Sequence, residues 1–172
     1  KHASTEDRVA LARRLKPICA SHGVALVIND DVEAAQISNV DGVHIGQQDM
    51  CVALARQTIG ADKIVGLSVE TVSAAKKVSE RLVDYVGISP VYATPTKHDH
   101  KQPIGFDGLK KICAASSVYT VAVGGLKLND CHDVLAAGAN GMAVVSAICG
   151  QNDPYAASIA FAKSLAKCER QK

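Results

Sequence analysis

The feature that most constrains the fold is a sixfold alternation of short apolar runs with segments of helical pattern. The runs are rich in Val, Ile and Ala, and each is short enough to be a buried strand. The predicted strands span 25–29, 42–46, 63–69, 83–89, 118–124 and 141–147. Apolar strands separated by helices predict an α/β fold with a parallel sheet and right-handed crossovers.

A predicted helix precedes the first strand, and one follows every strand. The first helix can be capped by Ser4 or Thr5, although Pro17 interrupts its pattern and is expected to kink it. Thr71 can cap the helix that runs to Leu82, and Pro154 suits the first turn of the last helix. The predicted helices span 4–21, 32–39, 50–59, 71–82, 106–115, 129–137 and 154–167.

The number of strands and the chain length together suggest a particular fold. An eight-stranded (β/α) barrel needs about 200 residues or more. Six strands in 172 residues therefore predict a TIM-type (β/α) barrel whose first two strands are missing, in a single domain over residues 1–172. An open, doubly wound sheet is the alternative. Aromatic residues are only 3% of the chain, so the core must be aliphatic, as in parallel sheets.

Composition and charge argue against several classes of protein. The net charge is +2 with no basic run, and aromatic residues are few, so we expect no nucleic-acid partner. No signal peptide or apolar run of membrane length is visible, so we expect a cytoplasmic protein without a membrane segment. The cysteines lack CxxC spacing and are expected to be scattered core thiols, with a disulfide or zinc site as the alternative. They are Cys19, Cys51, Cys113, Cys131, Cys149 and Cys168.

Two neighbouring strand ends near the end of the chain predict a phosphate site. Gly124 and Gly125 close one predicted strand, and Val145 and Ser146 lie near the end of the next. In (β/α) barrels these loops often bind phosphate, and glycine lets backbone N–H groups approach its oxygens. The alternative is that the glycine pair is only a tight turn.

Two acids follow neighbouring strands in the first half of the chain. Asp30 comes after Asn29, and Asp49 follows the next strand. One or two carboxylates together with a substrate phosphate are the usual protein site for Mg²⁺. The alternative is helix capping, by Asp30 or Asp31 before Val32 and by Asp49 before Met50.

A long polar loop over 90–104 contains hydroxyl groups and a lysine around a proline. Its residues Thr94, Pro95, Thr96 and Lys97 can bind and neutralise a phosphate, whereas the alternative is a solvated loop. We expect His44 to pack rather than to catalyse. Ser68 ends a strand at the binding edge but lacks a G-x-S-x-G elbow, so it is not predicted to be a nucleophile.

The ordered motifs LVINDD, DGVHIGQQD, GLSVET, GISPVYATPTK, AVGG and GMAVVSAI resemble those of the thiamine-phosphate synthase family. The resemblance covers nearly the whole chain. The related thiazole tautomerases usually lack the T-P-T-K loop. Lys1 matches the last lysine of the family's Q-x-R-x-K motif, so we expect the family's first strand and helix to lie outside this sequence.

The resemblance implies a transferase that joins hydroxymethylpyrimidine diphosphate to hydroxyethylthiazole phosphate with Mg²⁺ and releases diphosphate. Asp30 and Asp49 would bind Mg²⁺, while Lys97 and Ser68 are the candidate catalytic residues. The pyrimidine diphosphate would contact Lys1, Asn29, Ser68 and Lys97. The thiazole phosphate would contact Thr94, Pro95, Thr96, Gly124, Gly125, Val145 and Ser146. A thiazole tautomerase and a non-catalytic thiazole-phosphate sensor are the alternatives. The expected partners are these small molecules and, in a homo-oligomer, further copies of the chain.

Overall fold

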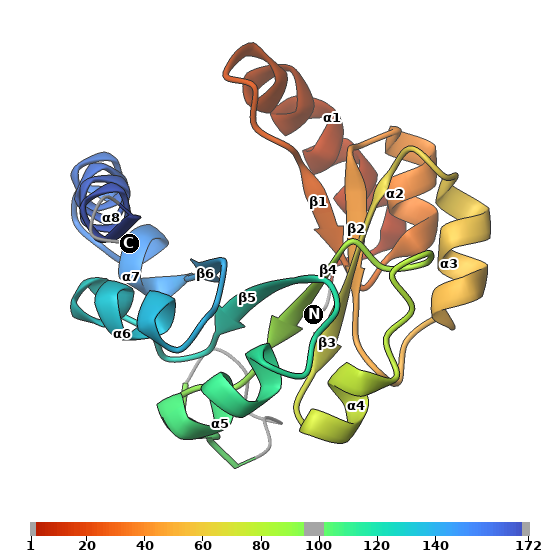
Figure 1. The fold of residues 1–172 in the computed structure, drawn as a ribbon. Helices are drawn as coiled ribbons and strands as arrows, with labels where there is room; N and C mark the ends of the chain where they lie inside the picture. The colour runs from red at the N-terminus through yellow and green to blue at the C-terminus, as the bar shows by residue number, and fades with distance from the viewer. Residues whose placement is uncertain (1–2, 95–101, 170–172) are drawn as a thin grey trace. The chain divides into compact units, whose positions relative to one another are not determined.

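The computed structural model describes residues 3–94 and 102–169, except the side chain of residue 169 (Figure 1). Its strands are β1 (Val27–Asn29), β2 (Gly42–Ile45), β3 (Ile64–Val69), β4 (Tyr85–Ile88), β5 (Tyr119–Val123) and β6 (Gly141–Ala143). They form one sheet in the order β1-β2-β3-β4-β5-β6. Sequential order confirms the barrel-type α/β fold and excludes a doubly wound sheet, in which the strand order reverses.

The pairs β1–β2, β2–β3 and β5–β6 are parallel. Asn29 of β1 lies opposite His44 of β2, and His44 lies opposite Gly66 of β3. In the second half of the chain, Val123 of β5 lies opposite Ala143 of β6. The carboxyl ends of paired parallel strands meet at one edge, which is where ligands bind in such folds.

The contacts divide the chain into two compact units, and the expectation of a single domain stays a prediction. Unit 1 contains residues 1–68 and 78–85, and unit 2 contains residues 69–77 and 86–172. Asn29, Asp30, Asp49 and Ser68 therefore belong to unit 1, whereas Gly124, Gly125, Val145 and Ser146 belong to unit 2.

Unit 1 carries α1 (Thr5–Ser21), α2 (Val32–Ser38) and α3 (Val52–Ile59), and α2 contacts both α1 and α3 (Figure 1). A capping box begins α1: the Asp7 N–H donates to Ser4 Oγ, and the Ser4 N–H donates to Asp7 Oδ2, each over 3.1 Å. Pro17 lies inside α1 and does not end the helix. The core of unit 1 is aliphatic, with Val43, Ile45 and Val65 fully buried.

Unit 2 carries the remaining helices. They are α4 (Val72–Lys76), α5 (Gly105–Cys113), the 3-10 helix η1 (Leu128–Asp130), α6 (Cys131–Ala136), α7 (Ser146–Cys149) and α8 (Pro154–Glu169). α6 contacts α8, and α4 contacts α5. Pro154 is the first residue of α8, as predicted, and Asp153 Oδ1 accepts the Ala156 N–H over 2.9 Å.

Two predicted elements were wrong in extent by more than two residues at one end. The helix expected to reach Leu82 ends at Lys76, because Ser79 O accepts the N–H groups of Leu82 and Val83 in a turn that leads the buried Val83 toward β4. The strand expected over 141–147 ends at Ala143, and α7 follows. Short apolar runs such as this one do not distinguish strand from helix by periodicity.

Surface and cysteine predictions can be compared with the described residues. All six cysteines are free, as expected, but Cys51 and Cys149 are exposed and only Cys131 is fully buried. The core placement was therefore wrong for the two exposed thiols.

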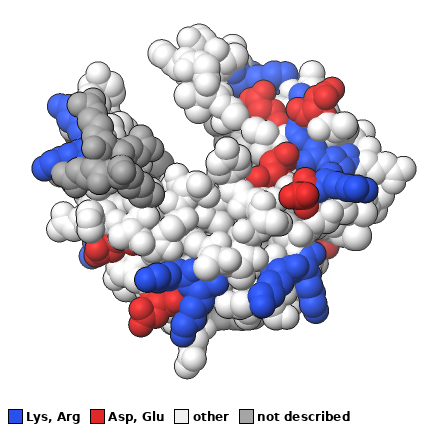
Figure 2. Space-filling model, in the orientation of Figure 1, with Lys and Arg blue, Asp and Glu red and all other residues white. Residues whose placement is uncertain are grey.

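Figure 2 shows basic and acidic side chains interspersed on the face that it displays. Within the described ranges, no helix is long and apolar enough to cross a membrane.

Candidate functional site

The carboxyl end of β1 carries Asn29, Asp30 and Asp31, which have different environments. Asp31 is the N-cap of α2: its Oδ1 accepts the Ala34 N–H over 2.8 Å. Its Oδ2 accepts from Thr5 Oγ1 over 2.9 Å and from Arg8 Nη1 over 3.0 Å. Burial raises the pKa of Asp31, but these hydrogen bonds and the Arg8 charge outweigh burial and hold the pKa below its usual value. The capping role therefore belongs to Asp31 and not to Asp30.

Asp30 has an unusual backbone conformation. Its φ is +67°, in the left-handed region, and its N–H donates to His44 O over 2.8 Å. Aspartate tolerates this region better than most residues, yet a non-glycine residue there carries strain. A strained acid at a strand end, with capping excluded as its role, supports a functional role for Asp30.

Asp49 lies in the turn that follows β2. Its Oδ2 accepts the Gly46 N–H over 2.6 Å, and its own N–H donates to Gly46 O over 3.3 Å. The N-cap of α3 is Cys51, so the alternative that Asp49 caps this helix is wrong. The Asp49 side chain closes a local turn and is exposed at the end of β2.

The residues present fit a hard divalent cation. Asn29, Asp30 and Asp49 offer amide and carboxylate oxygens at the ends of the paired strands β1 and β2. Among the described residues, no group of three or more His, Cys, Asp or Glu could hold a metal ion. Mg²⁺ commonly takes only one or two carboxylates and keeps several waters or phosphate oxygens. The assignment of Asp30 and Asp49 to Mg²⁺ stays a prediction.

Ser68 lies in β3 and is linked to two aromatic side chains of unit 1. His44 Nε2 lies 2.9 Å from Ser68 Oγ, and His44 Nδ1 lies 3.0 Å from the Tyr85 hydroxyl oxygen. The Gln47 side chain also donates to Ser68 O over 2.7 Å. Sequence reasoning assigned His44 to packing and missed Tyr85. Both ring nitrogens of His44 are hydrogen-bonded, so its role is more specific than packing.

The glycine pair of unit 2 packs against the loop that follows β4. Gly124 has φ +103° and Gly125 has φ +67°. A Cβ on Gly125 would lie 2.7 Å from Ala93 O and 2.7 Å from Tyr92 Cβ. The Val91 N–H donates to Val123 O over 2.9 Å, and the Tyr92 N–H donates to Gly124 O over 3.0 Å. The glycines therefore let the loop approach the end of β5, a role that the sequence did not reveal.

The structure describes only some of the other residues that were predicted to bind phosphate. Thr94 follows the loop segment that packs on Gly125, and Ser146 is the first residue of α7, preceded by the exposed Val145. β5 and β6 are paired, so the ends that precede Gly124 and Val145 are neighbours. Lys1, Pro95, Thr96 and Lys97 lie outside the described residues, and their roles stay predictions.

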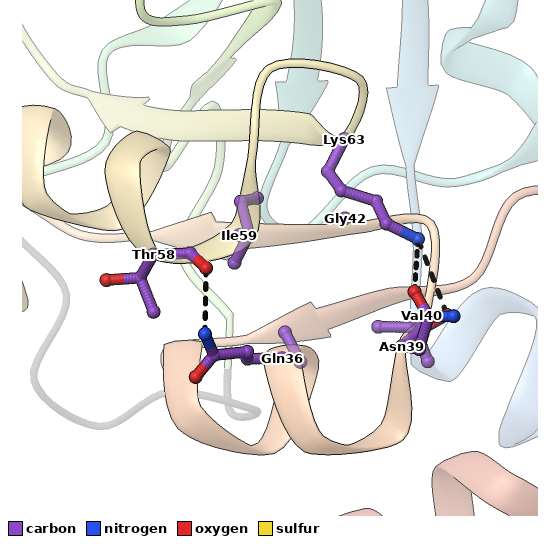
Figure 3. Close-up of a pocket in the computed structure, with 8 residues that line it drawn as sticks. Gln36, Asn39, Val40, Gly42, Thr58, Ile59 and Lys63 are labelled. Atoms are coloured by element: carbon purple, nitrogen blue, oxygen red, sulfur yellow. Dashed lines mark hydrogen bonds between the residues drawn. The ribbon is translucent and has the colours of Figure 1, made fainter.

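A pocket of about 250 Å³ in unit 1 lies away from these strand ends (Figure 3). Its polar contacts join Lys63 Nζ to Asn39 Oδ1 over 2.7 Å and Gln36 Nε2 to Thr58 O over 3.0 Å. Gly42, the first residue of β2, also lines it, so it lies at the amino end of that strand. None of the predicted site residues is among the described residues that line it.

Comparisons with known proteins identify the family. The family model described as thiamine monophosphate synthase matches residues 1–148. The chain belongs to the thiamine monophosphate synthase family. It is 43% identical over 159 residues to the thiamine-phosphate synthase of Albidiferax ferrireducens, covering 92% of this chain and 73% of that protein. It is 44% identical over 158 residues to the enzyme of the same name from Chloroflexus aurantiacus, again covering 92% and 73%.

A solved structure agrees with this assignment. The thiamine phosphate pyrophosphorylase from Pyrococcus furiosus is 28% identical and matches with a TM-score of 0.88, covering 98% of this chain and 80% of that chain. Membership of the thiamine monophosphate synthase family confirms the resemblance drawn from the motifs. It also confirms that the chain is an enzyme of the transferase class.

Proposed function

We propose that this enzyme joins a hydroxymethylpyrimidine diphosphate to a hydroxyethylthiazole phosphate, with Mg²⁺, to make thiamine phosphate and diphosphate. The observation that carries the proposal is the set of polar groups at the carboxyl ends of β1, β2 and β3, within a chain that matches the family over residues 1–148. These groups are Asn29, Asp30, Asp49 and Ser68, and they suit a diphosphate and its cation.

The pyrimidine diphosphate binds through unit 1 in this proposal. Asn29 and Ser68 offer neutral hydrogen-bonding groups, and Lys1 offers positive charge to the phosphates. Lys97, from the second half of the chain, would add a further positive charge. Asp30 and Asp49 would hold the Mg²⁺, which when bound neutralises charge on the diphosphate. The exposed Asp49 carboxylate and the strained backbone of Asp30 support these two roles.

The thiazole phosphate binds through unit 2 in this proposal. Gly124 and Gly125 contribute backbone N–H groups, Val145 a further backbone N–H, and Ser146 its hydroxyl. Thr94 and Thr96 would donate their hydroxyl groups to the phosphate, and Pro95 would stiffen the chain between them. The segment from Val91 to Ala93, just before Thr94, packs against the glycine pair at the end of β5.

The reaction needs positioning and charge stabilisation rather than a covalent intermediate. The bond between the pyrimidine methylene carbon and oxygen breaks, and diphosphate leaves with the electron pair. The aminopyrimidine stabilises the resulting cation, and the thiazole nitrogen then bonds to that carbon. Lys97 donates to the leaving diphosphate as its charge grows, and Ser68 donates a hydrogen bond to it.

The test is to incubate the full-length protein with both substrates, with and without Mg²⁺, and to follow thiamine phosphate and diphosphate. We expect equal amounts of the two products and loss of both when Mg²⁺ is chelated. Formation of both products at an unchanged rate without Mg²⁺ would contradict the metal role. Isomerisation of a thiazole in the absence of the pyrimidine would instead indicate a tautomerase.

A further inference from the structure

Three side chains of unit 1 form a continuous hydrogen-bonded chain across β2, β3 and β4. The Tyr85 hydroxyl oxygen lies 3.0 Å from His44 Nδ1, and His44 Nε2 lies 2.9 Å from Ser68 Oγ. The two ring centroids are 5.4 Å apart, with an angle of 32° between the planes. All three residues are half-buried, so solvent competes only partly with these contacts.

Strand β3 lies between His44 of β2 and Tyr85 of β4, and it carries a glycine where these two side chains meet. Gly66 of β3 lies opposite His44, and a Cβ on Gly66 would clash with Tyr85 Cζ and with His44 Nδ1. The absence of a side chain at Gly66 therefore allows the imidazole and the phenol to meet above β3. A hydrogen bond that requires a glycine in the intervening strand is a specific arrangement, not a chance surface contact.

The chemistry of the three groups favours one direction for the protons. A neutral imidazole has one N–H donor and one acceptor nitrogen, while each hydroxyl can donate one proton and accept others. A phenol has a pKa of about 10 and is a stronger acid than an aliphatic alcohol, so Tyr85 is the better donor to Nδ1. Burial raises the pKa of Tyr85 further and keeps the phenol protonated. With Tyr85 as the donor to Nδ1, the imidazole proton would lie on Nε2 and would be directed at Ser68 Oγ.

We propose that His44 is a positioning residue that acts through Ser68. Tyr85 holds His44 as the Nε2–H tautomer, His44 donates to Ser68 Oγ, and the Ser68 hydroxyl is left to donate its own proton to the pyrimidine diphosphate. In the opposite tautomer Ser68 would donate to His44 instead, and the substrate would lose that hydrogen bond. The proposal rests on the proposed function, because that function assigns the substrate contact to Ser68.

The first test is spectroscopic and needs no turnover. In ¹⁵N-labelled protein at about pH 8, where an ordinary imidazole is neutral, the protonated and unprotonated ring nitrogens resonate far apart. The His44 signals are assigned by their loss in His44→Gln. We expect the proton on Nε2 in the parent and its transfer largely to Nδ1 in Tyr85→Phe, where Nδ1 has lost its donor. The matched control is Tyr119→Phe, because Tyr119 is 70% exposed.

The second test is a double-mutant cycle measured on kcat/KM for the pyrimidine diphosphate. We expect Tyr85→Phe to lower this value roughly tenfold, because the Ser68 hydroxyl would lose its hydrogen bond to the charged diphosphate. In a Ser68→Ala background the same change should cost less than about twofold, because the two residues act as one unit. KM for the thiazole phosphate should not change.

The outcomes separate the two proposals. A proton on Nδ1 in the parent, an unchanged tautomer in Tyr85→Phe, or effects of Tyr85→Phe and Ser68→Ala that multiply would each overturn the role of His44. Failure of the folded parent protein to form thiamine phosphate would contradict the proposed function. In that case the tautomer measurement would still decide whether Tyr85 sets the state of His44.

Discussion

In unit 1 the candidate groups are side chains at strand ends, whereas in unit 2 the end of β5 is made of glycine backbone. Asp30, Asp49 and Ser68 each present a polar side chain after or within a strand. Gly124 and Gly125 instead bring the chain into contact with the loop after β4. A side-chain group can be replaced by one of similar shape, but the glycine backbone cannot be altered without moving its neighbours. Substitutions of these strand-end side chains in unit 1 should therefore reduce activity, whereas substitutions of the glycine pair in unit 2 should reduce stability.

The largest effect should come from Gly125→Ala. The new Cβ would meet Ala93 O and Tyr92 Cβ, and the φ of +67° strains any L-residue. Crowding costs about 1–3 kcal/mol and the left-handed conformation about 1–2 kcal/mol, so we expect a loss of about 2–5 kcal/mol in the free energy of unfolding. Denaturant titration measures it.

Gly23→Ala is the matched control for this change. Gly23 has φ +64°, and nothing lies within 4 Å of the position that its Cβ would take. It should lose only the conformational part, about 1–2 kcal/mol. Equal losses at the two glycines would show that crowding against Tyr92 and Ala93 is unimportant.

Lys97→Ala tests whether catalysis also depends on a side chain from the second half of the chain. Removing a donor to the leaving diphosphate should lower kcat roughly a hundred- to thousand-fold, equivalent to about 2.7–4 kcal/mol, with little change in KM. Lys97→Arg should not restore the rate, because a planar guanidinium does not replace a compact ammonium. Steady-state kinetics measure both variants.

Lys110→Ala, at an exposed position in α5, is the control for Lys97→Ala and should keep the parental rate. If Lys97→Ala keeps kcat and raises only KM for the thiazole phosphate, Lys97 is a binding residue. All remaining candidate catalytic side chains would then belong to unit 1, and unit 2 would contribute only to binding and stability.

Asp49→Asn should separate metal binding from folding. The amide oxygen can still accept the Gly46 N–H, so the free energy of unfolding should change by less than about 0.5 kcal/mol. Loss of the charge should raise the Mg²⁺ concentration needed for half-maximal rate roughly ten- to hundredfold. Asp153→Asn, at the cap of α8, is the control and should leave this concentration unchanged.

The smallest effect concerns pH and Asp31. Its pKa is lowered in the folded protein, so the charged carboxylate stabilises the fold above the unfolded pKa of about 3.9. This contribution is lost as the pH falls through the lower, folded pKa. Asn caps helices as well as Asp, so Asp31→Asn should keep the cap but flatten this acid dependence. Unfolding measured between about pH 2 and pH 7 tests it, and an unchanged slope would contradict it.

The strands and their order could be predicted from the sequence because each apolar run is short, regular and followed by a helix. The ends of elements were harder. Residues 141–147 are apolar enough for a strand, yet the chain turns at Val145, whose O accepts the N–H groups of Ile148 and Cys149. Residues 77–82 continue a helical pattern but form a turn. In both places local hydrogen bonds decided the outcome, and periodicity does not detect them.

Individual residues of the candidate site could be predicted from the sequence, but the contacts between them could not. Strand-end logic and family motifs both selected Asp30, Asp49, Ser68 and Gly125. Neither selected Tyr85 or Gly66, because their importance depends on the register that sets His44 opposite Gly66. Nor did they show that Asp31, and not Asp30, caps α2. Contacts between strands depend on pairing distances that the linear order of residues does not contain.

The empty position above Gly66 also restricts the order in which relatives can diverge. A side chain at position 66 does not fit while His44 and Tyr85 meet above β3, because both of these side chains would have to move. We therefore expect His44 or Tyr85 to be shortened or displaced before position 66 gains a side chain. Reversal is blocked in the same way, because an aromatic pair cannot return until position 66 is glycine again. Positions 44, 66 and 85 should therefore change together among relatives, and few relatives should carry a side chain at position 66 together with both His44 and Tyr85.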